Sequence, residues 1–311
     1  MSAECAKTRR MKLLAFALAA LSLLAAPVRA ADLVVDAAAD FTVDATINGH
    51  AVRLRVDPAA SGYIILNPET VTRIGLRRSM LGSRTQIGPV RLTGSSRVAR
   101  VGLGGVVGDR RVVWLNDRAA VEGADGLIGP ADMPYNRVTF DLGAPRAGEA
   151  RFELPMAFER SYGLFFPMSL GGQEVRFQLT LTKADTMATA GAGAHLAALN
   201  GGAWIGDARE QLIDFGVVRP VRPLALARPV SLNGLYLGRL LVRTGDNRGN
   251  LTLPPEPDAD PDEVVVAGES RQRAAFNVTL GRDRLSQCSR LVWDNGTRRM
   301  SLECIPLPPP V

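Results

Sequence analysis

The stretch RLRVDPAASGYIIL (residues 53–66) alternates charged and apolar residues like a strand, then places a carboxylate, Asp57, where the strand ends. Pro58, two alanines, Ser61 and Gly62 follow before the chain becomes apolar again. An acid between a strand and a loop of small residues is either a turn former or part of a functional site. Its place in the whole chain decides between these two interpretations.

The surroundings of this stretch recur later in the sequence. Three blocks reappear in the same order: FTVDATINGHAVRLRV (41–56) as FFPMSLGGQEVRFQLT (165–180), RVGLGGVVGDRRVV (100–113) as PVSLNGLYLGRLLV (229–242), and GLIGPADMPYNRVTFDL (126–142) as TLGRDRLSQCSRLVWDN (279–295). Between them lie short Val/Leu/Ile runs broken by Gly, Pro, Asn and Asp, which predict mainly β structure. The chain is therefore predicted to contain two copies of one β unit.

The repeat also predicts the domain layout. Residues 31–155 form the first lobe and residues 163–305 the second, joined by a linker at 156–162. The second lobe carries a Pro- and acid-rich insertion at about 245–273, whose composition is typical of a surface loop. The Pro-rich residues 306–311 are expected to form an extended, disordered tail.

The N-terminus has the pattern of a secretory signal peptide over residues 1–30. Lys7, Arg9, Arg10 and Lys12 precede the apolar run LLAFALAALSLLAAP, and VRA offers a cleavage site after Ala30. About 14 apolar residues fall short of the roughly 20 that a membrane-spanning helix needs. We therefore expect a periplasmic or secreted protein with no integral membrane segment after cleavage; Sec and twin-arginine export both stay open.

Charge gives little support for a nucleic-acid partner. Removing residues 1–30 removes five basic and one acidic residue, so the formal net charge falls from +6 to +2. Lys183 is then the only lysine, and the arginines are scattered along the sequence without interleaved aromatic residues. A basic stripe of the kind that binds nucleic acid is not predicted.

The inventory of reactive residues excludes several kinds of site. The chain has only two histidines, His50 and His195, far apart in sequence, and contains no G-x-S-x-G, H-E-x-x-H or phosphate-loop motif. Neither a zinc site nor a Ser-His-Asp triad is predicted, and no cofactor or metal is expected.

The cysteines agree with export. Once Cys5 leaves with the signal peptide, Cys288 and Cys304 remain as an even pair. They flank SRLVWDNGTRRMSLE, which predicts two strands around an Asn295-Gly296 turn. Because such a hairpin brings both sulfurs face to face, we predict a cross-strand disulfide between Cys288 and Cys304.

The order of these features resembles the retropepsin-like aspartic peptidases, the pepsin/retropepsin superfamily in its exported bacterial form. The first copy combines the DPAAS loop and NPETVTRIGL with DGLIGPADM and RVTFDL, and the second carries VTLGRDRL with RLVWDN. The resemblance implies two tandem β-barrel lobes related by a pseudo-twofold axis, each with about one short helix. It also implies a pseudo-dimer within one chain, expected to be monomeric.

In that family one aspartate from each lobe meets the other, and the pair activates a water on a peptide bond. Asp57 holds the first position. Direct register places Thr180 at the second position, whereas sliding five residues on finds Asp185 in KADTMAT. The spacing of 16 residues from Asp185 to Gly201 resembles the 18 from Asp57 to Gly75, which favours the second register. Asp57 and Asp185 are therefore the predicted catalytic residues, with Thr180 as the alternative counterpart.

Both loops depart from the family pattern Asp-Thr-Gly-Ala-Ser/Thr. Pro58 removes a hydroxyl and a backbone N–H, Ala59 replaces a glycine, and Met187 does the same in the second loop. Two functions follow. The chain is either an aspartic endopeptidase acting on peptides or unfolded proteins, or a degenerate member of that fold that binds a peptide or an envelope protein.

Overall fold

The computed structural model describes residues 32–246 and 275–306. The predicted signal peptide and cleavage site, nearly all of the predicted insertion and the last five residues of the predicted tail lie outside these ranges. In the part of the chain that is described, no helix is long and apolar enough to cross a membrane.

The first lobe is built on a seven-stranded sheet with the order β2-β3-β8-β4-β7-β6-β5. Its strands are β2 (Thr42–Ile47), β3 (His50–Val56), β4 (Ile64–Leu66), β5 (Gly82–Ile87), β6 (Val90–Leu103), β7 (Val106–Leu115) and β8 (Gly126–Ile128). A second contact of β2 with β6, at Thr46 and Ile47, curls the sheet into a barrel.

The second lobe repeats this arrangement. Its sheet has the order β11-β12-β13-β19-β14-β18-β17-β15, and β16 pairs with β17 beside that path. The strands are β11 (Ala157–Glu159), β12 (Gly163–Leu170), β13 (Gln173–Leu179), β14 (Met187–Ala188), β15 (Gly202–Trp204), β16 (Arg209–Asp214), β17 (Val217–Leu232), β18 (Leu235–Arg243) and β19 (Asn277–Leu280). The order β12-β13-β19-β14-β18-β17 matches β2-β3-β8-β4-β7-β6 strand for strand, so the three repeated sequence blocks fold into matching elements.

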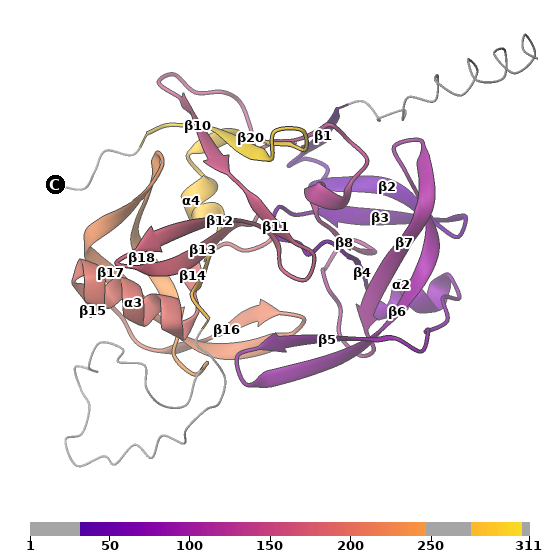
Figure 1. The fold of residues 1–311 in the computed structure, drawn as a ribbon, viewed down its shortest axis with the longest axis horizontal. Coiled ribbons are helices and arrows are strands. Elements are labelled where there is room, and N and C mark those ends of the chain that lie inside the picture. The colour runs from indigo at the N-terminus through magenta and orange to yellow at the C-terminus, as the bar shows by residue number, and fades with distance from the viewer. Residues whose placement is uncertain (1–31, 247–274, 307–311) are drawn as a thin grey trace, which may run out of the picture.

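A third sheet joins the two halves of the chain, with the order β1-β9-β20-β21-β10. It contains β1 (Leu33–Asp36), β9 (Arg137–Asp141), β10 (Ala150–Pro155), β20 (Cys288–Asp294) and β21 (Arg299–Cys304). Figure 1 shows this sheet along one side of the molecule, across both lobes. Its apolar face belongs to a hydrophobic core that continues into both lobes, with Phe140 and Leu302 fully buried.

The hairpin of β20 and β21 confirms the predicted disulfide. Cys288 and Cys304 are direct cross-strand partners, and their sulfur atoms are bonded. The turn takes four residues, 295–298, because Asp294 Oδ1 accepts hydrogen bonds from the backbone N–H groups of Gly296 and Thr297.

Helices are few among the described residues, and they are short: α2 (Pro68–Arg73), α3 (Ala190–Asn200), α4 (Arg282–Leu285) and the 3₁₀ turn η2 (Pro130–Asp132). Each lobe has one of these helices after its short strand β4 or β14: α2 begins after Asn67, and α3 begins after Thr189. The predicted fold class, mainly β with two barrel-like lobes and about one short helix in each, is confirmed.

Candidate functional site

The loop after β3 begins at Asp57 and is held by its own lobe. β3 and β8 are parallel neighbours, and Asp57 N–H donates to Ile128 O at 3.1 Å, continuing their ladder. Asp57 O accepts from Ala60 N–H and Asp57 Oδ1 from Ala59 N–H, at 3.0 and 2.7 Å, which closes a tight turn. Gly129 lies under this turn, where a Cβ would come within 2.7 Å of Ala60 O.

The altered residues of this loop fit without backbone strain. Ala59 is not among the residues with positive φ, so its methyl group is compatible with the turn. Pro58 has no N–H to donate, and the N–H that reaches the carboxylate comes from Ala59 instead. Neither Pro58 nor Ala59 therefore distorts the loop.

The loop after β13 begins at Thr180 and has the same frame. Thr180 N–H donates to Leu280 O at 3.0 Å, as Asp57 N–H does to Ile128 O. Gly281 lies under this loop, where a Cβ would come within 2.6 Å of Asp185 C and O. Thr180 is therefore the counterpart of Asp57 in the second lobe.

The two loops meet across the lobe interface, and Asp57 is the acceptor. Its Oδ2 accepts from Thr180 Oγ1 at 2.8 Å and from the backbone N–H groups of Leu181 and Thr182, both at 3.0 Å. With Ala59 N–H on Oδ1, four donors converge on one carboxyl group. Asp57 and Thr180 are each 1% exposed, so this contact is closed to solvent.

Asp185 lies elsewhere on the same loop. Its side chain is 43% exposed and pairs with Arg209 at 3.6 Å between Oδ2 and Nη2. The backbone around Asp185 is fixed to the start of α4, because Lys183 O and Ala184 O accept hydrogen bonds from the N–H groups of Arg282 and Asp283. No hydrogen bond joins the carboxyl groups of Asp57 and Asp185 in the described part of the chain, so the structure does not bring the predicted pair together.

The length of a helix explains why the sequence favoured Asp185. Both α2 and α3 are followed closely by a left-handed glycine, Gly75 with φ 64° and Gly201 with φ 68°. However, α3 has 11 residues where α2 has 6. The longer helix moves Gly201 further along the sequence. The spacing from Asp185 to Gly201 therefore resembles that from Asp57 to Gly75 although Asp185 is not the first residue of the loop after β13.

Beside this contact, residues of both lobes enclose a cavity of about 560 Å³. Burial lowers the pKa of the Arg55 guanidinium at its edge, with the nearby Asp57 acting in the opposite direction. Charged residues of both signs line it, with apolar side chains between them: Arg55, Asp117, Arg118, Glu122, Leu127, Lys183, Asp185, Met187, Leu212, Ile213, Asp214 and Phe215.

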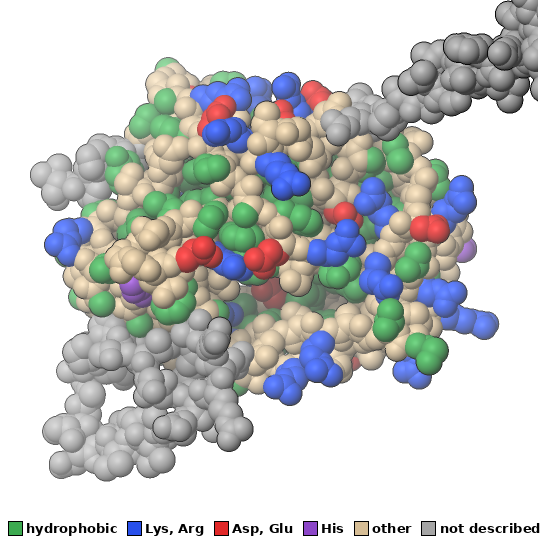
Figure 2. Space-filling view, viewed as in Figure 1, with side chains coloured by type: hydrophobic (Ala, Val, Ile, Leu, Met, Phe, Trp, Pro, Cys, Tyr) green, Lys and Arg blue, Asp and Glu red, His purple; other side chains and the backbone are tan. Residues whose placement is uncertain are grey.

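Two hairpins, one from each lobe, meet at the side of the molecule where β5 and β16 run next to each other (Figure 1). A small hydrophobic cluster joins them, made of Ile87, Leu92, Leu115, Met187, Ile213, Val217, Val221 and Leu241. Arg118 Nη1 also donates to Phe215 O at 3.2 Å, and Gly88 at the β5–β6 turn lies against Asp246. Figure 2 shows that this face is hollowed between β16 and the strands above it.

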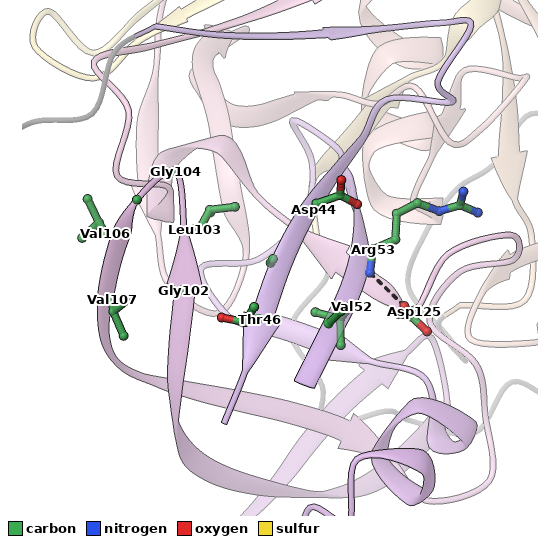
Figure 3. A pocket seen from close by; sticks show the side chains of 13 residues that line it. Asp44, Thr46, Val52, Arg53, Gly102, Leu103, Gly104, Val106, Val107 and Asp125 are labelled. Carbon is green, nitrogen blue, oxygen red and sulfur yellow. Dashed lines mark hydrogen bonds between the residues drawn. The ribbon is translucent and has the colours of Figure 1, made fainter. Parts of the chain in front are cut away.

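A larger groove, about 740 Å³, lies on the outer side of the first lobe between β2, β3 and the β6–β7 turn (Figure 3). Asp125 lies at one end of it and accepts from Arg53 N–H, as drawn, and from Thr70 and Arg73. Burial acts to raise the pKa of Asp125, but these hydrogen bonds outweigh it and hold the pKa below its usual range. Asp125 is thus engaged in holding β3 and α2 together.

Two acids near the loops and one of the two histidines also have structural partners. Asp283 accepts from Thr186 Oγ1, and Asp132 pairs with Arg110 at 3.2 Å. His195 Nε2 is within 2.7 Å of Leu170 O, and His50 lies exposed at the β2–β3 turn. Among the described residues, no three His, Cys, Asp or Glu side chains come together as a metal site would require.

Known proteins resemble this chain in part. A family model described as "Aspartyl protease" matches residues 43–130, which run from β2 to the start of η2 and include Asp57 and Gly129. The crystal structure of an aspartic proteinase from Irpex lacteus is similar with 11% sequence identity and a TM-score of 0.40, over 85% of this chain and 94% of that chain. No curated protein matches the sequence. The resemblance to aspartic peptidases predicted from the sequence is confirmed over residues 43–130, in the first lobe.

Proposed function

We propose that the chain is a non-hydrolytic member of the aspartyl-protease-like fold, which holds an extended peptide or protein segment between its lobes. The observation that carries this proposal is the position of Thr180. It stands where a second catalytic carboxylate is required, and its hydroxyl donates directly to Asp57.

The chemistry of an aspartic dyad explains why this matters. Two carboxyl groups about 3 Å apart share one proton, and one of them polarises the substrate carbonyl while the other activates water. A threonine hydroxyl can donate a hydrogen bond, but it cannot replace the second carboxylate, because it carries no charge with which to activate water and does not titrate near neutral pH. Three donors already occupy Asp57 Oδ2, so that oxygen is engaged in joining the lobes.

The interlobe cavity supports a binding role. Its volume of about 560 Å³ is within the range of roughly 300–1,000 Å³ that ligand sites occupy. β16 pairs only with β17 among the described strands, and residues 211–214 line the cavity, so the other edge of β16 is available for strand pairing. An extended peptide can add to such an edge through its backbone, with side-chain pockets giving selectivity.

We also propose that the protein is exported to the periplasm or secreted. The basic and apolar N-terminal pattern and the Cys288–Cys304 disulfide support this location. Cell fractionation with mass measurement of the mature chain tests it, and we expect a chain that starts at Ala31. A cytosolic protein that keeps Met1 would overturn the proposal.

The absence of hydrolysis is tested with an unfolded protein as substrate, incubated between about pH 3 and pH 7 where aspartic dyads work. We expect no cleavage beyond that seen with the Asp57→Asn variant. Cleavage by the natural chain that Asp57→Asn abolishes would show a working peptidase and would overturn the proposal.

Binding is tested with a library of labelled, unstructured peptides by fluorescence anisotropy. Ala184 is exposed and lines the cavity, so Ala184→Trp should block it without disturbing the core. Ala147→Trp, at an exposed alanine between β9 and β10, is the matched control. We expect Ala184→Trp alone to weaken peptide binding by at least about tenfold. Equal binding by both variants would place the ligand outside the cavity.

A further inference from the structure

Arginines gather on one side of the first lobe, although they look scattered in the sequence. Residues 74–116 contain eight arginines and a single acid, Asp109. Six of these arginines are exposed and form no ion pair with any described residue: Arg77, Arg78, Arg84, Arg91, Arg97 and Arg100. Arg100 is opposite Asp109 and, three residues after Arg97, projects from the other face of β6. We call the other five side chains the arginine face.

Strand pairing brings these residues together. In the β5–β6 hairpin, Arg84 is opposite Thr93 and Arg91 is opposite Gln86, so both arginines project from the same face. Ser79 N–H donates to Ser96 O at 2.9 Å, which places the Arg77–Arg78 loop next to the middle of β6. Figure 2 shows basic side chains gathered over the part of the surface where β6 and β7 lie.

Two large apolar side chains project from the same loop. Met80 is fully exposed at 104%, and Leu81 is 61% exposed. The loop is fixed to the strand, because Ser96 Oγ donates to Leu81 O at 2.7 Å and accepts from Arg111 Nη1 at 3.0 Å. The two apolar side chains are therefore held out into solvent, beside arginines that form no ion pair within residues 32–246 and 275–306.

The rest of the surface has a different character. Arginines outside this face commonly have acidic partners, among them Arg137 with Asp294, Arg151 with Glu153, and Arg290 with Glu303. A run of arginines with no acidic partner among the described residues, around two exposed aliphatic side chains, is not required by the fold. It matches a surface that is both negatively charged and able to accept apolar groups.

We propose that the arginine face, with Met80 and Leu81, docks the first lobe onto an anionic phospholipid membrane. Arginine guanidinium groups pair with lipid phosphates, and Met80 and Leu81 enter the boundary between headgroups and acyl chains. A nucleic acid fits less well, because the one aromatic residue in 74–116, Trp114, is 6% exposed and cannot stack on bases. This docking does not depend on the function of the interlobe cavity.

Co-sedimentation of the full chain with lipid vesicles tests the proposal. We expect binding to vesicles of phosphatidylcholine mixed with phosphatidylglycerol, little binding to phosphatidylcholine alone, and weaker binding as salt is raised. The double variant Arg77→Ser/Arg78→Ser should bind about 25-fold more weakly, at roughly fivefold for each arginine. Met80→Ser/Leu81→Ser should weaken binding by at least about tenfold.

Matched controls come from the second lobe and the joint sheet. Arg239→Ser/Arg298→Asn removes two exposed arginines, and Val218→Ser removes an exposed aliphatic side chain of 49% exposure. Both controls should bind like the natural chain. No binding to the anionic vesicles, or equal loss in the controls, would overturn the proposal. Loss in the arginine variant without loss in the Met80/Leu81 variant, together with tight binding to heparin, would assign the face to a soluble polyanion instead.

Discussion

The loops after β3 and β13 occupy the same place in two matching lobes, yet one begins with a buried carboxylate and the other with a threonine. Asp57 and Thr180 both donate their N–H group to the end of a parallel neighbour, and a glycine lies under each loop. The backbone frame is therefore built from strand pairing and close glycine packing. Nothing in that frame requires an acid, so a lobe can keep the geometry of the site without its chemistry.

The largest effect is expected when the Asp57 carboxylate is removed. Asp57→Ala leaves the Thr180 hydroxyl and three backbone N–H groups without their acceptor in the lobe interface, at 1% exposure. We expect the free energy of unfolding to fall by about 3–5 kcal/mol, measured by guanidinium denaturation.

Asp185→Ala is the matched control for this change. Its side chain is 43% exposed and its partner Arg209 is 54% exposed, so we expect a loss within about 0.5 kcal/mol. If the two substitutions cost the same, Asp57 is not the acceptor that joins the lobes.

The second prediction places an acid in both loops. Thr180→Asp removes the hydroxyl that donates to Asp57 and sets two carboxyl groups within about 3 Å of each other. We expect the free energy of unfolding to fall by about 2–4 kcal/mol at neutral pH, measured by denaturation across a pH series.

The free energy of unfolding of Thr180→Asp should depend on pH. Two close carboxyl groups share one proton, which raises one apparent pKa of the folded pair above the value of about 3.9 for an unfolded Asp. The variant should therefore be most stable below that unfolded value and lose stability as pH rises through the raised pKa. Thr180→Val lacks the second acid and is the control. If Thr180→Asp and Thr180→Val have the same pH profile, residues 57 and 180 do not face each other across the lobe interface.

The third prediction concerns what the two loops share. Gly129→Ala and Gly281→Ala each place a Cβ within 2.7 Å or less of backbone atoms of the loop above. Each should cost about 1–3 kcal/mol, in the lobe with the acid and in the lobe without it. Gly108→Ala is the control, because a Cβ there meets nothing within 4 Å. A cost confined to Gly129 would mean that the frame of the second lobe is looser than its backbone hydrogen bonds indicate.

Much of the fold could be predicted from short-range patterns. Alternating apolar residues and Gly or Asn turns predict the hairpins β2–β3, β12–β13 and β20–β21, and the cysteine spacing predicts the disulfide across the last of these. Asp57 was found because strand alternation ends at Val56, one residue before it.

The rest depended on distances that no local pattern encodes. The sequence spacing favours Asp185 over Thr180 only through Gly201, whose place in the sequence reflects the length of α3. The hydrophobic cluster between the lobes joins Ile87 to Ile213, two residues on hairpins far apart in sequence that show only ordinary strand alternation. The arginine face is scattered along the chain and gathers only when β5, β6 and the Arg77–Arg78 loop come together.

The smallest expected effect compares the two acids that flank β8. Burial acts to raise the pKa of Asp125, but hydrogen bonds from Arg53 N–H, Arg73 and Thr70 hold it below its ordinary value, whereas burial raises the pKa of Asp132 despite its pairing with Arg110. The stability contributed by Asp125 is present above the unfolded pKa of about 3.9 and is lost as pH falls through the lowered folded value. For Asp132 the sign is opposite, because its folded pKa is raised: stability is lost as pH rises from about 3.9 through the folded value.

Unfolding measured at several pH values for Asp125→Asn and Asp132→Asn separates these two contributions. Relative to the natural chain, Asp125→Asn should lose less stability on acidification, and Asp132→Asn should lose less stability as pH rises above about 4. Neither acid has an acidic counterpart in the second lobe: counted from Gly129 and Gly281, the matching positions are Asn277 and Arg284. If both variants shift the pH profile in the same direction, hydrogen bonding does not outweigh burial at Asp125, and its assigned role between β3 and α2 is wrong.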